Sequence, residues 1–332
     1  MGVKRIKNAL AIVVLTKRRF PFANVLLGLG IYAIGILISV HYNFLDYFLK
    51  IWYFPLASFG IIWVSSLWTW GFAFLQRMFE ELGSTFEIEE LQFKKVVEDL
   101  VRRLSNDKRA LLFSIPGFAF LIYHTWLIQT GGLVIPFIEP SAVSTNLVMF
   151  VYVMALFAFV MYFIFASVYL LFNGLLFLKK TTRFPIRIRL LQKKKVKLDK
   201  TNQVILGSTI GWFVGVSFVM TILFVYSSTV VFSFLVFVVA FGMLFFFIPQ
   251  LLFRNSIRNS KENLLDKVES EFSIKVKFPL SSECNINEAL LLCAIFDKVE
   301  RISEWSFETS TLFKLFSSVV IPVAVFLMGL IL

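Results

Sequence analysis

His124 is the first residue to consider for chemistry, because an imidazole inside a membrane can relay a proton or bind a metal ion. It lies in "IYHTW", within a predicted membrane span, whereas the other histidine, His41, falls in a predicted outer loop. Without partners nearby, a satisfied or interfacial role is favoured for His124. Hydroxyl side chains inside the predicted spans could join it in a polar path, or could bond to carbonyls of their own helices: Thr69, Ser208, Thr209, Ser217 and Thr221.

Motifs of enzymes and of metal sites do not occur in the chain. There is no Walker A loop, HExxH pair, GxSxG elbow or dinucleotide-binding glycine pattern. The spacing of Cys284 and Cys293 fits no zinc or redox motif. Carboxylates such as Glu80 and Glu81 follow no catalytic pattern. The sequence therefore predicts a protein that is not an enzyme, with no catalytic residue, metal ligand or cofactor.

Three glycines at four-residue spacing form a glycine zipper in "GSTIGWFVG": Gly207, Gly211 and Gly215. This spacing places a groove along one helix face and lets a second helix approach closely in lipid. The partner could be a helix of the same chain, or the groove could lie at a subunit interface or near a pore axis. A weaker version occurs in "GLGIYAIG", with Gly28, Gly30 and Gly35.

A strongly basic tract, "KKTTRFPIRIRLLQKKKVKLDK", occupies residues 179–200 and contains one acid, Asp199. Nucleic-acid binding would need stacking or base-reading groups beside the charges, and Phe184 is its single aromatic residue. The tract directly follows a long apolar segment, which favours contact with anionic lipid headgroups and no nucleic-acid partner. The candidate lipid contacts are Lys179, Lys180, Arg183, Arg187, Arg189, Lys193, Lys194 and Lys195.

The elements that carry these residues must be membrane helices. The chain has 332 residues, of which 58% are hydrophobic and 16% charged, and its mean hydropathy is +0.80. A soluble domain could not bury so much apolar surface, whereas about 20 apolar residues per helix suit a bilayer. We predict an all-α polytopic membrane protein with about seven spans, at residues 22–40, 51–75, 111–129, 147–178, 204–226, 229–253 and 312–332. These spans fall into four membrane segments, 22–75, 111–178, 204–253 and 312–332.

The charges between the spans predict an orientation. Segments 1–21, 76–110, 179–203 and 254–311 hold every Lys and Arg except Lys50 and Lys314. By the positive-inside rule these segments are cytoplasmic, so the N-terminus is inside and the C-terminus outside. Segment 1–21 is predicted to be a basic amphipathic segment on the inner membrane surface. The basic bias and the two unpaired cysteines fit a plasma membrane, prokaryotic in type.

Two of the cytoplasmic segments are predicted to form helices. In 76–110 a helical seam is formed by Phe93, Val97, Leu100 and Leu104, and in 254–311 two helices are expected, the second with one face made of Ile286, Leu290, Cys293, Phe296 and Val299. We predict that these helices form a small cytoplasmic bundle. The seams could pack within one chain or across the subunits of a homo-oligomer.

Function is predicted from the absence of charges in the middle of any span, which argues against ion-coupled transporters and voltage sensors. The leading hypothesis is an oligomeric ion channel or pore-like protein, with the glycine zipper near its axis. One alternative is a non-conducting scaffold or signalling protein that recruits a partner through its cytoplasmic helices. The other is a transporter of a lipid-like or apolar substrate, which would need no buried charge.

Overall fold

The computed structural model describes residues 23–43, 45–50, 53–104, 106–129, 147–188, 196, 198–223, 228–275 and 286–331. Within these ranges the protein is helical and contains no β-strand. Several predictions lie outside them, namely those on segment 1–21, Cys284, Arg189, Lys193, Lys194 and Lys195, together with the side chains of His124 and Thr221.

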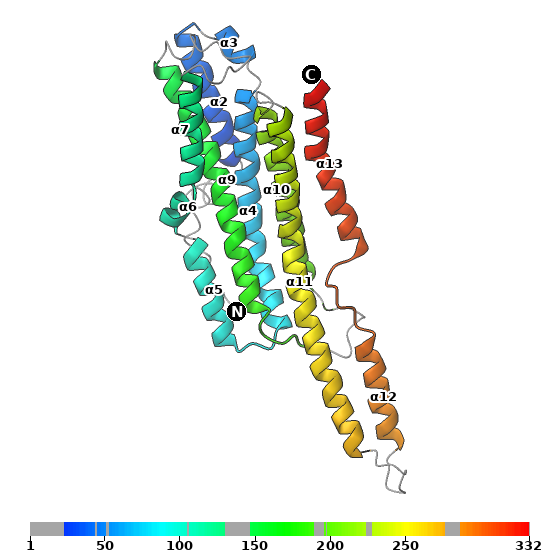
Figure 1. The fold of residues 1–332 in the computed structure, drawn as a ribbon. Helices are drawn as coiled ribbons and strands as arrows, with labels where there is room; N and C mark the ends of the chain where they lie inside the picture. Colours follow the sequence, from blue (N-terminus) through cyan, green and yellow to red (C-terminus); the bar gives the residue numbers. More distant parts are fainter. Residues whose placement is uncertain are drawn as a thin grey trace.

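Long helices run side by side along one axis (Figure 1). They are α2 (Ala23–His41), α4 (Tyr53–Thr85), α7 (Ile115–Gln129), α9 (Leu147–Thr181), α10 (Asp199–Leu223), α11 (Ser228–Lys275) and α13 (Thr309–Ile331). Shorter helices connect or flank them: α3 (Leu45–Lys50), α5 (Glu90–Leu104), α6 (Asp107–Phe113) and α12 (Ile286–Glu300). The all-α fold class is therefore confirmed.

Four helices of the described part are long and apolar enough to cross a membrane: Ala23–His41, Phe150–Thr181, Leu235–Ile274 and Thr309–Met328. These support a membrane protein. The predicted span 111–129 is divided at Ser114, between α6 and α7. Pro116 explains this division, because a proline cannot donate to the carbonyl four residues earlier and is tolerated mainly in the first turn of a helix.

Helix α10 lies at the centre of the packing, against α4 on one side and α11 and α13 on others. Helix α4 also packs against α2, and α9 packs against α4, α5, α6 and α7. Aromatic side chains fill these contacts; for example, the rings of Phe79 and Phe177 lie 5.3 Å apart in an edge-to-face arrangement. The high phenylalanine content thus supplies much of the buried core, which includes Phe48, Phe54, Phe163, Phe213, Phe246 and Phe253.

Helix α11 continues without a break through 48 residues, with Pro249 inside it. At 1.5 Å per residue it is about 72 Å long, more than twice the thickness of a hydrocarbon core. Its second half pairs with α12, and the two form a hairpin that projects beyond the other helices (Figure 1). The sequence correctly predicted that a helix would continue from the apolar segment into residues 254–275.

The face predicted for α12 differs from the buried one. Of the predicted face, Val299 is buried, but Leu290 and Phe296 are 63% and 39% exposed and Cys293 is exposed. Leu292, which lies outside the predicted face, is buried. The reason is that α12 packs mainly on one helix, α11, which covers only a narrow stripe of its surface. Such a stripe can lie anywhere on a helix that is apolar over most of its circumference.

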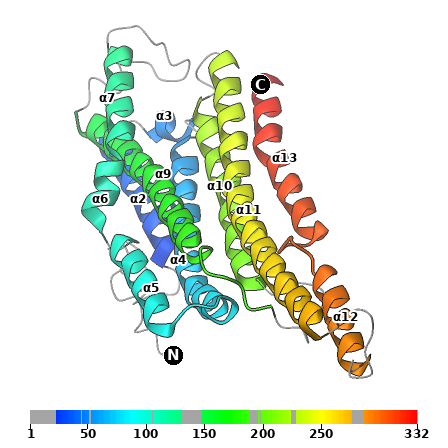
Figure 2. The same ribbon diagram turned by 60° about the horizontal axis from the view of Figure 1, so that its bottom comes forward.

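The seam predicted for α5 is confirmed, because Phe93, Val97, Leu100 and Leu104 are all buried. Its partners are α9 and α4. Figures 1 and 2 show α5 on the opposite side of the molecule from α12. The predicted single bundle of α5, the end of α11 and α12 is therefore not formed by the described residues, since α5 buries its seam against the long helices instead.

Candidate functional site

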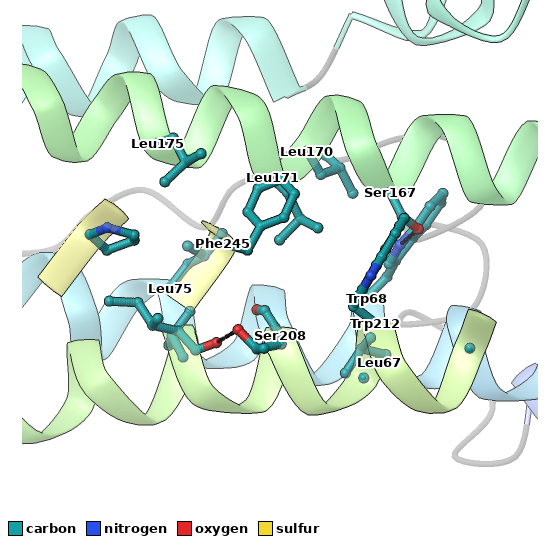
Figure 3. Close-up of a pocket in the computed structure, with 18 of the residues that line it drawn as sticks. Leu67, Trp68, Leu75, Ser167, Leu170, Leu171, Leu175, Ser208, Trp212 and Phe245 are labelled. Carbon is teal, nitrogen blue, oxygen red and sulfur yellow. Dashed lines mark hydrogen bonds between the residues drawn. The ribbon is translucent and has the colours of Figure 1, made fainter. Parts of the chain in front are cut away.

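A cavity of about 200 Å³ lies between α9 and α10, with α4 behind it. In Figure 3, side chains from four helices point into this space: Leu170, Leu171 and Leu175 from α9, Ser208 from α10, Leu75 from α4 and Phe245 from α11. We call this space the α9–α10 cleft. Leu100 and Leu104 of α5, which packs alongside α9, also line the cleft.

Glycines keep the cleft open. A Cβ atom added at Gly71 or at Gly174 would meet no atom within 4 Å. At Gly215 the nearest atoms would be those of Trp63 and Val64, at 3.9 Å. Since protein interiors normally fill such space, these positions mark room for something other than the protein's own side chains.

The indole of Trp68 and the hydroxyl of Ser167, both beside the cleft, have partners within the protein. The indole Nε1 of Trp68 donates to Ser167 Oγ at 2.9 Å, and that hydroxyl donates to the carbonyl oxygen of Phe163 at 2.8 Å. No group of three or more residues that could hold a metal ion occurs in the described ranges. The cleft is lined mainly by apolar side chains, as are the ~150 Å³ cavities that take up benzene, so it suits a hydrocarbon ligand.

The glycine zipper of α10 faces α4 of the same chain. A Cβ atom at Gly207 would collide with the indole ring of Trp70, and one at Gly211 would collide with the side chain of Leu67. The Gly211 carbonyl also accepts a hydrogen bond from Trp63 Nε1 at 3.4 Å. Gly211 and Gly215 reach the wall of the cleft as well.

The hydroxyls of the predicted polar path are not gathered along one line. Thr209 and Ser217 donate to carbonyls one turn earlier in α10, at 2.9 and 2.7 Å. Thr69 donates to the Ser65 carbonyl at 2.9 Å and lies near α2, where Asn24 donates to it at 3.3 Å. The structure brings Ser208 and Thr209 to the wall of the cleft.

The basic residues of the described tract surround the end of α9. Lys179, Arg183 and Arg187 are exposed. Lys180 forms an ion pair with Asp99 of α5 at 2.7 Å. Their role as anionic-lipid contacts stays a prediction, and the structure adds that Lys179 directly follows Leu178, which lines the cleft.

Two groups of polar residues that the sequence did not single out join the helix ends. Glu81 of α4 accepts hydrogen bonds from the backbone N–H groups of Lys200 and Thr201 and from the Thr201 hydroxyl, at 3.0, 2.7 and 2.7 Å. A carboxylate at this place satisfies free amides and complements the helix dipole of α10. No local pattern marks Glu81, because its partners lie about 120 residues away.

The second group is a buried network of Asn202, Gln250 and Ser306, which joins α10, α11 and the segment before α13. Gln250 Nε2 donates to Asn202 Oδ1 at 3.0 Å, and Ser306 Oγ donates to Gln250 Oε1 at 2.7 Å. Asn202 Nδ2 donates to the Ser306 carbonyl at 2.8 Å. Gln250 is the single amide side chain in the apolar run 229–253, which was a usable signal in the sequence.

An ion-pair cluster holds α5 against α9. Asp99 pairs with Lys180 at 2.7 Å and with Arg103 and Arg102 at 3.1 and 3.2 Å. The Lys180 ammonium, together with the two guanidinium groups, holds the pKa of the Asp99 carboxyl well below its usual range, against an opposing effect of burial. Tyr169 of α9 adds a hydrogen bond from its hydroxyl to the Arg103 carbonyl at 2.8 Å.

We expect the stability that Asp99 contributes to fall as the pH is lowered. Its pKa is lower in the folded chain than the ~3.9 of an unfolded one, so the contribution is present above about pH 5 and is lost progressively below about pH 4. Asp99→Asn should cost about 1 kcal/mol at pH 7. Thermal unfolding of wild type and variant between pH 7 and pH 3 should show the two midpoints converging. A constant difference, or the same effect in Glu98→Gln, would contradict this role.

Comparisons of the chain with protein-family models, with curated proteins and with solved structures find no match. The features of the described residues that point to a function are the α9–α10 cleft and the basic residues that follow α9. Both are properties of the packed helices.

Proposed function

We propose that this protein binds a lipid-like amphiphile in the membrane, with the hydrocarbon part in the α9–α10 cleft. The observation that carries the proposal is the apolar cavity of about 200 Å³, lined by side chains of α4, α9, α10 and α11 and kept open at Gly71 and Gly174. An acyl chain needs no charged partner, which accords with spans that carry no central charge. Movement of the bound molecule across the membrane would be the corresponding transport activity.

The proposed membrane arrangement has seven spans, formed by α2, α4, α7, α9, α10, α11 and α13. It is supported by their parallel alignment (Figure 1) and by the four helices whose length and composition suit a span. The basic segments would face the cytoplasm at a plasma membrane, with the N-terminus inside and the C-terminus outside. In this arrangement the cleft opens in the cytoplasmic half of the bilayer.

The ion-channel hypothesis has less support than lipid binding. It was based on the glycine zipper as a pore-proximal or intersubunit surface and on the hydroxyls as a polar path. Gly207 and Gly211 instead lie against Trp70 and Leu67 of the same chain, and Thr209 donates to a carbonyl of its own helix. These contacts supply helix packing without needing a second subunit or a water-filled path.

One observation favours the scaffold hypothesis as a second candidate. Leu290, Leu291 and Phe296 are exposed apolar side chains of α12, in the hairpin that projects beyond the other helices (Figure 1). Large exposed apolar patches mark interaction sites in soluble regions. A cytoplasmic protein or a second copy of the chain could cover this surface, and such recruitment is compatible with lipid binding in the cleft.

Gly174→Leu tests the lipid-binding proposal. A Cβ atom at this position meets nothing within 4 Å, so we expect the variant to fold, while its side chain occupies the cleft. In vesicles that contain a phospholipid with a photoactivatable acyl chain, wild-type protein should be labelled on α9 and α10 at the cleft. Labelling of these peptides in Gly174→Leu should fall to background.

Gly30→Leu is the matched control, because Gly30 of α2 also has no atom within 4 Å of an added Cβ and does not line the cleft. It makes the same change of side chain and should keep wild-type labelling of α9 and α10. Absence of cleft labelling in the wild type, or equal labelling in Gly174→Leu, would contradict the proposed function.

A further inference from the structure

The two walls of the α9–α10 cleft each end in a lysine. On α9, Leu171 and Leu175 line the cleft, and Lys179 follows at the next four-residue step. Residues four apart lie one above the other on a helix. Lys179 therefore continues the face of Leu171 and Leu175 by one turn and directly follows Leu178, the last residue of α9 that lines the cleft.

The same arrangement occurs on α10, which runs in the opposite direction. Ser208 and Val204 line the cleft, and Lys200 precedes Val204 by four residues, in the first turn of α10. Figure 3 shows that Leu171 and Leu175 lie across the cleft from Ser208. On both helices, therefore, a lysine lies one turn beyond a residue that lines the cleft.

Both ammonium groups are available for a ligand. The side chains of Lys179 and Lys200 are exposed, and neither forms an ion pair with another described residue. The neighbouring Lys180 is different, because Asp99 holds it at 2.7 Å. Two carboxylates lie near the backbone of Lys200. Asp199 precedes it in the first turn of α10, and the two oxygens of Glu81 on α4 already accept hydrogen bonds from the backbone N–H groups of Lys200 and Thr201.

We propose, on the basis of the lipid-binding function above, that the cleft selects a phospholipid with a net negative headgroup. One acyl chain occupies the cleft, and the headgroup phosphate lies between Lys179 and Lys200. An ammonium group binds phosphate as a point charge with three donors. A zwitterionic headgroup carries its own cation, which weakens its attraction to the two lysines. The protein would therefore bind a lipid of net negative charge more tightly than a zwitterionic one.

The double variant Lys179→Gln/Lys200→Gln tests this selection in the full-length protein. Two nanodisc preparations would contain equal amounts of phosphatidylglycerol and phosphatidylcholine. In the first the phosphatidylglycerol carries a photoactivatable acyl chain, and in the second the phosphatidylcholine does. Labelling of the cleft peptides is then compared between the two preparations. Wild type should prefer phosphatidylglycerol, and the double variant should lose about tenfold of this preference, since each lysine near the surface favours an anionic lipid. Lys94→Gln/Lys95→Gln on the exposed face of α5 removes the same charge and should keep the preference.

The possible outcomes distinguish the selection of anionic lipids from lipid binding in the cleft. Equal cleft labelling by both lipids in the wild type, or an unchanged preference in Lys179→Gln/Lys200→Gln, would overturn the inference while lipid binding stands. An equal loss in the α5 control would overturn it too, because the general charge of the surface would then be the cause. Loss of cleft labelling for both lipids would defeat the proposed function itself. Inorganic phosphate at millimolar concentration should not compete, and competition that abolishes phospholipid labelling would assign the lysines to a free anion.

Discussion

Gly211→Ala is expected to lower the free energy of unfolding by about 1–3 kcal/mol, the usual cost of overpacking a filled contact. The added methyl group would collide with the side chain of Leu67, at the buried contact between α10 and α4. Gly211→Leu should have a larger effect and prevent close approach of the two helices. Thermal unfolding in nanodiscs, followed by circular dichroism, measures both.

Gly215→Ala, one turn later in the same helix, is the control. Its added methyl group would have its nearest neighbours at 3.9 Å, an ordinary van der Waals distance. The gain in helix propensity on replacing glycine is the same at both positions, so the difference between the variants isolates the contact with α4. Equal midpoints for the two variants would contradict intrachain packing as the role of Gly211 and return the glycine zipper to the subunit-interface hypothesis.

Gln250→Leu is expected to destabilise the protein by a similar amount, about 1–3 kcal/mol, because it removes two hydrogen bonds from buried polar groups. The weaker hydrogen bond from Ser306 Oγ to Asn202 Oδ1, at 3.4 Å, would remain. Asn202 Oδ1 would lose its donor at 3.0 Å, and Ser306 Oγ would lose its acceptor at 2.7 Å. The network joins the segment 301–308 to α10 and α11, so the variant should also increase proteolysis within this segment. Unfolding midpoints and mass-spectrometric mapping of the cleavage sites measure the two effects.

Two comparisons make this result specific. Gln203→Leu, at an exposed position beside Asn202, removes an amide without breaking the network and should leave both measurements unchanged. Ser306→Ala and Gln250→Leu should be less than additive when combined, since both remove the same hydrogen bond. Strict additivity of the two substitutions would show that the network does not act as one unit.

The membrane class and most helix positions follow from local properties of the sequence. Hydropathy over about 20 residues indicates a span, and apolar residues at steps of three and four mark a buried helix face. The seam of α5 illustrates this, because Phe93, Val97, Leu100 and Leu104 are buried as predicted. The continuation of α11 beyond the apolar segment was also predictable, since no helix-breaking residue follows Pro249 before residue 275.

Periodicity was less informative where a helix has few neighbours. In α12 apolar residues occupy more than one face, so the pattern alone did not determine which face would be covered. The structure buries Leu292 and Val299 and exposes Leu290 and Phe296, because α12 packs mainly on α11. The division of the third predicted span had a local cause in Pro116, which hydropathy averaged over a window does not register.

By itself, the sequence determined that the chain is helical and apolar enough for a membrane, that its basic residues gather between the apolar segments, and that three glycines share one face of a helix. Only the tertiary structure decided what these features contact. It placed Gly211 against Leu67, Glu81 against the first turn of α10, and side chains of α4, α9, α10 and α11 around one cleft. The physical reason is that hydropathy and helical periodicity act over a few turns, whereas the cleft and the polar network depend on which helices, distant in sequence, pack side by side.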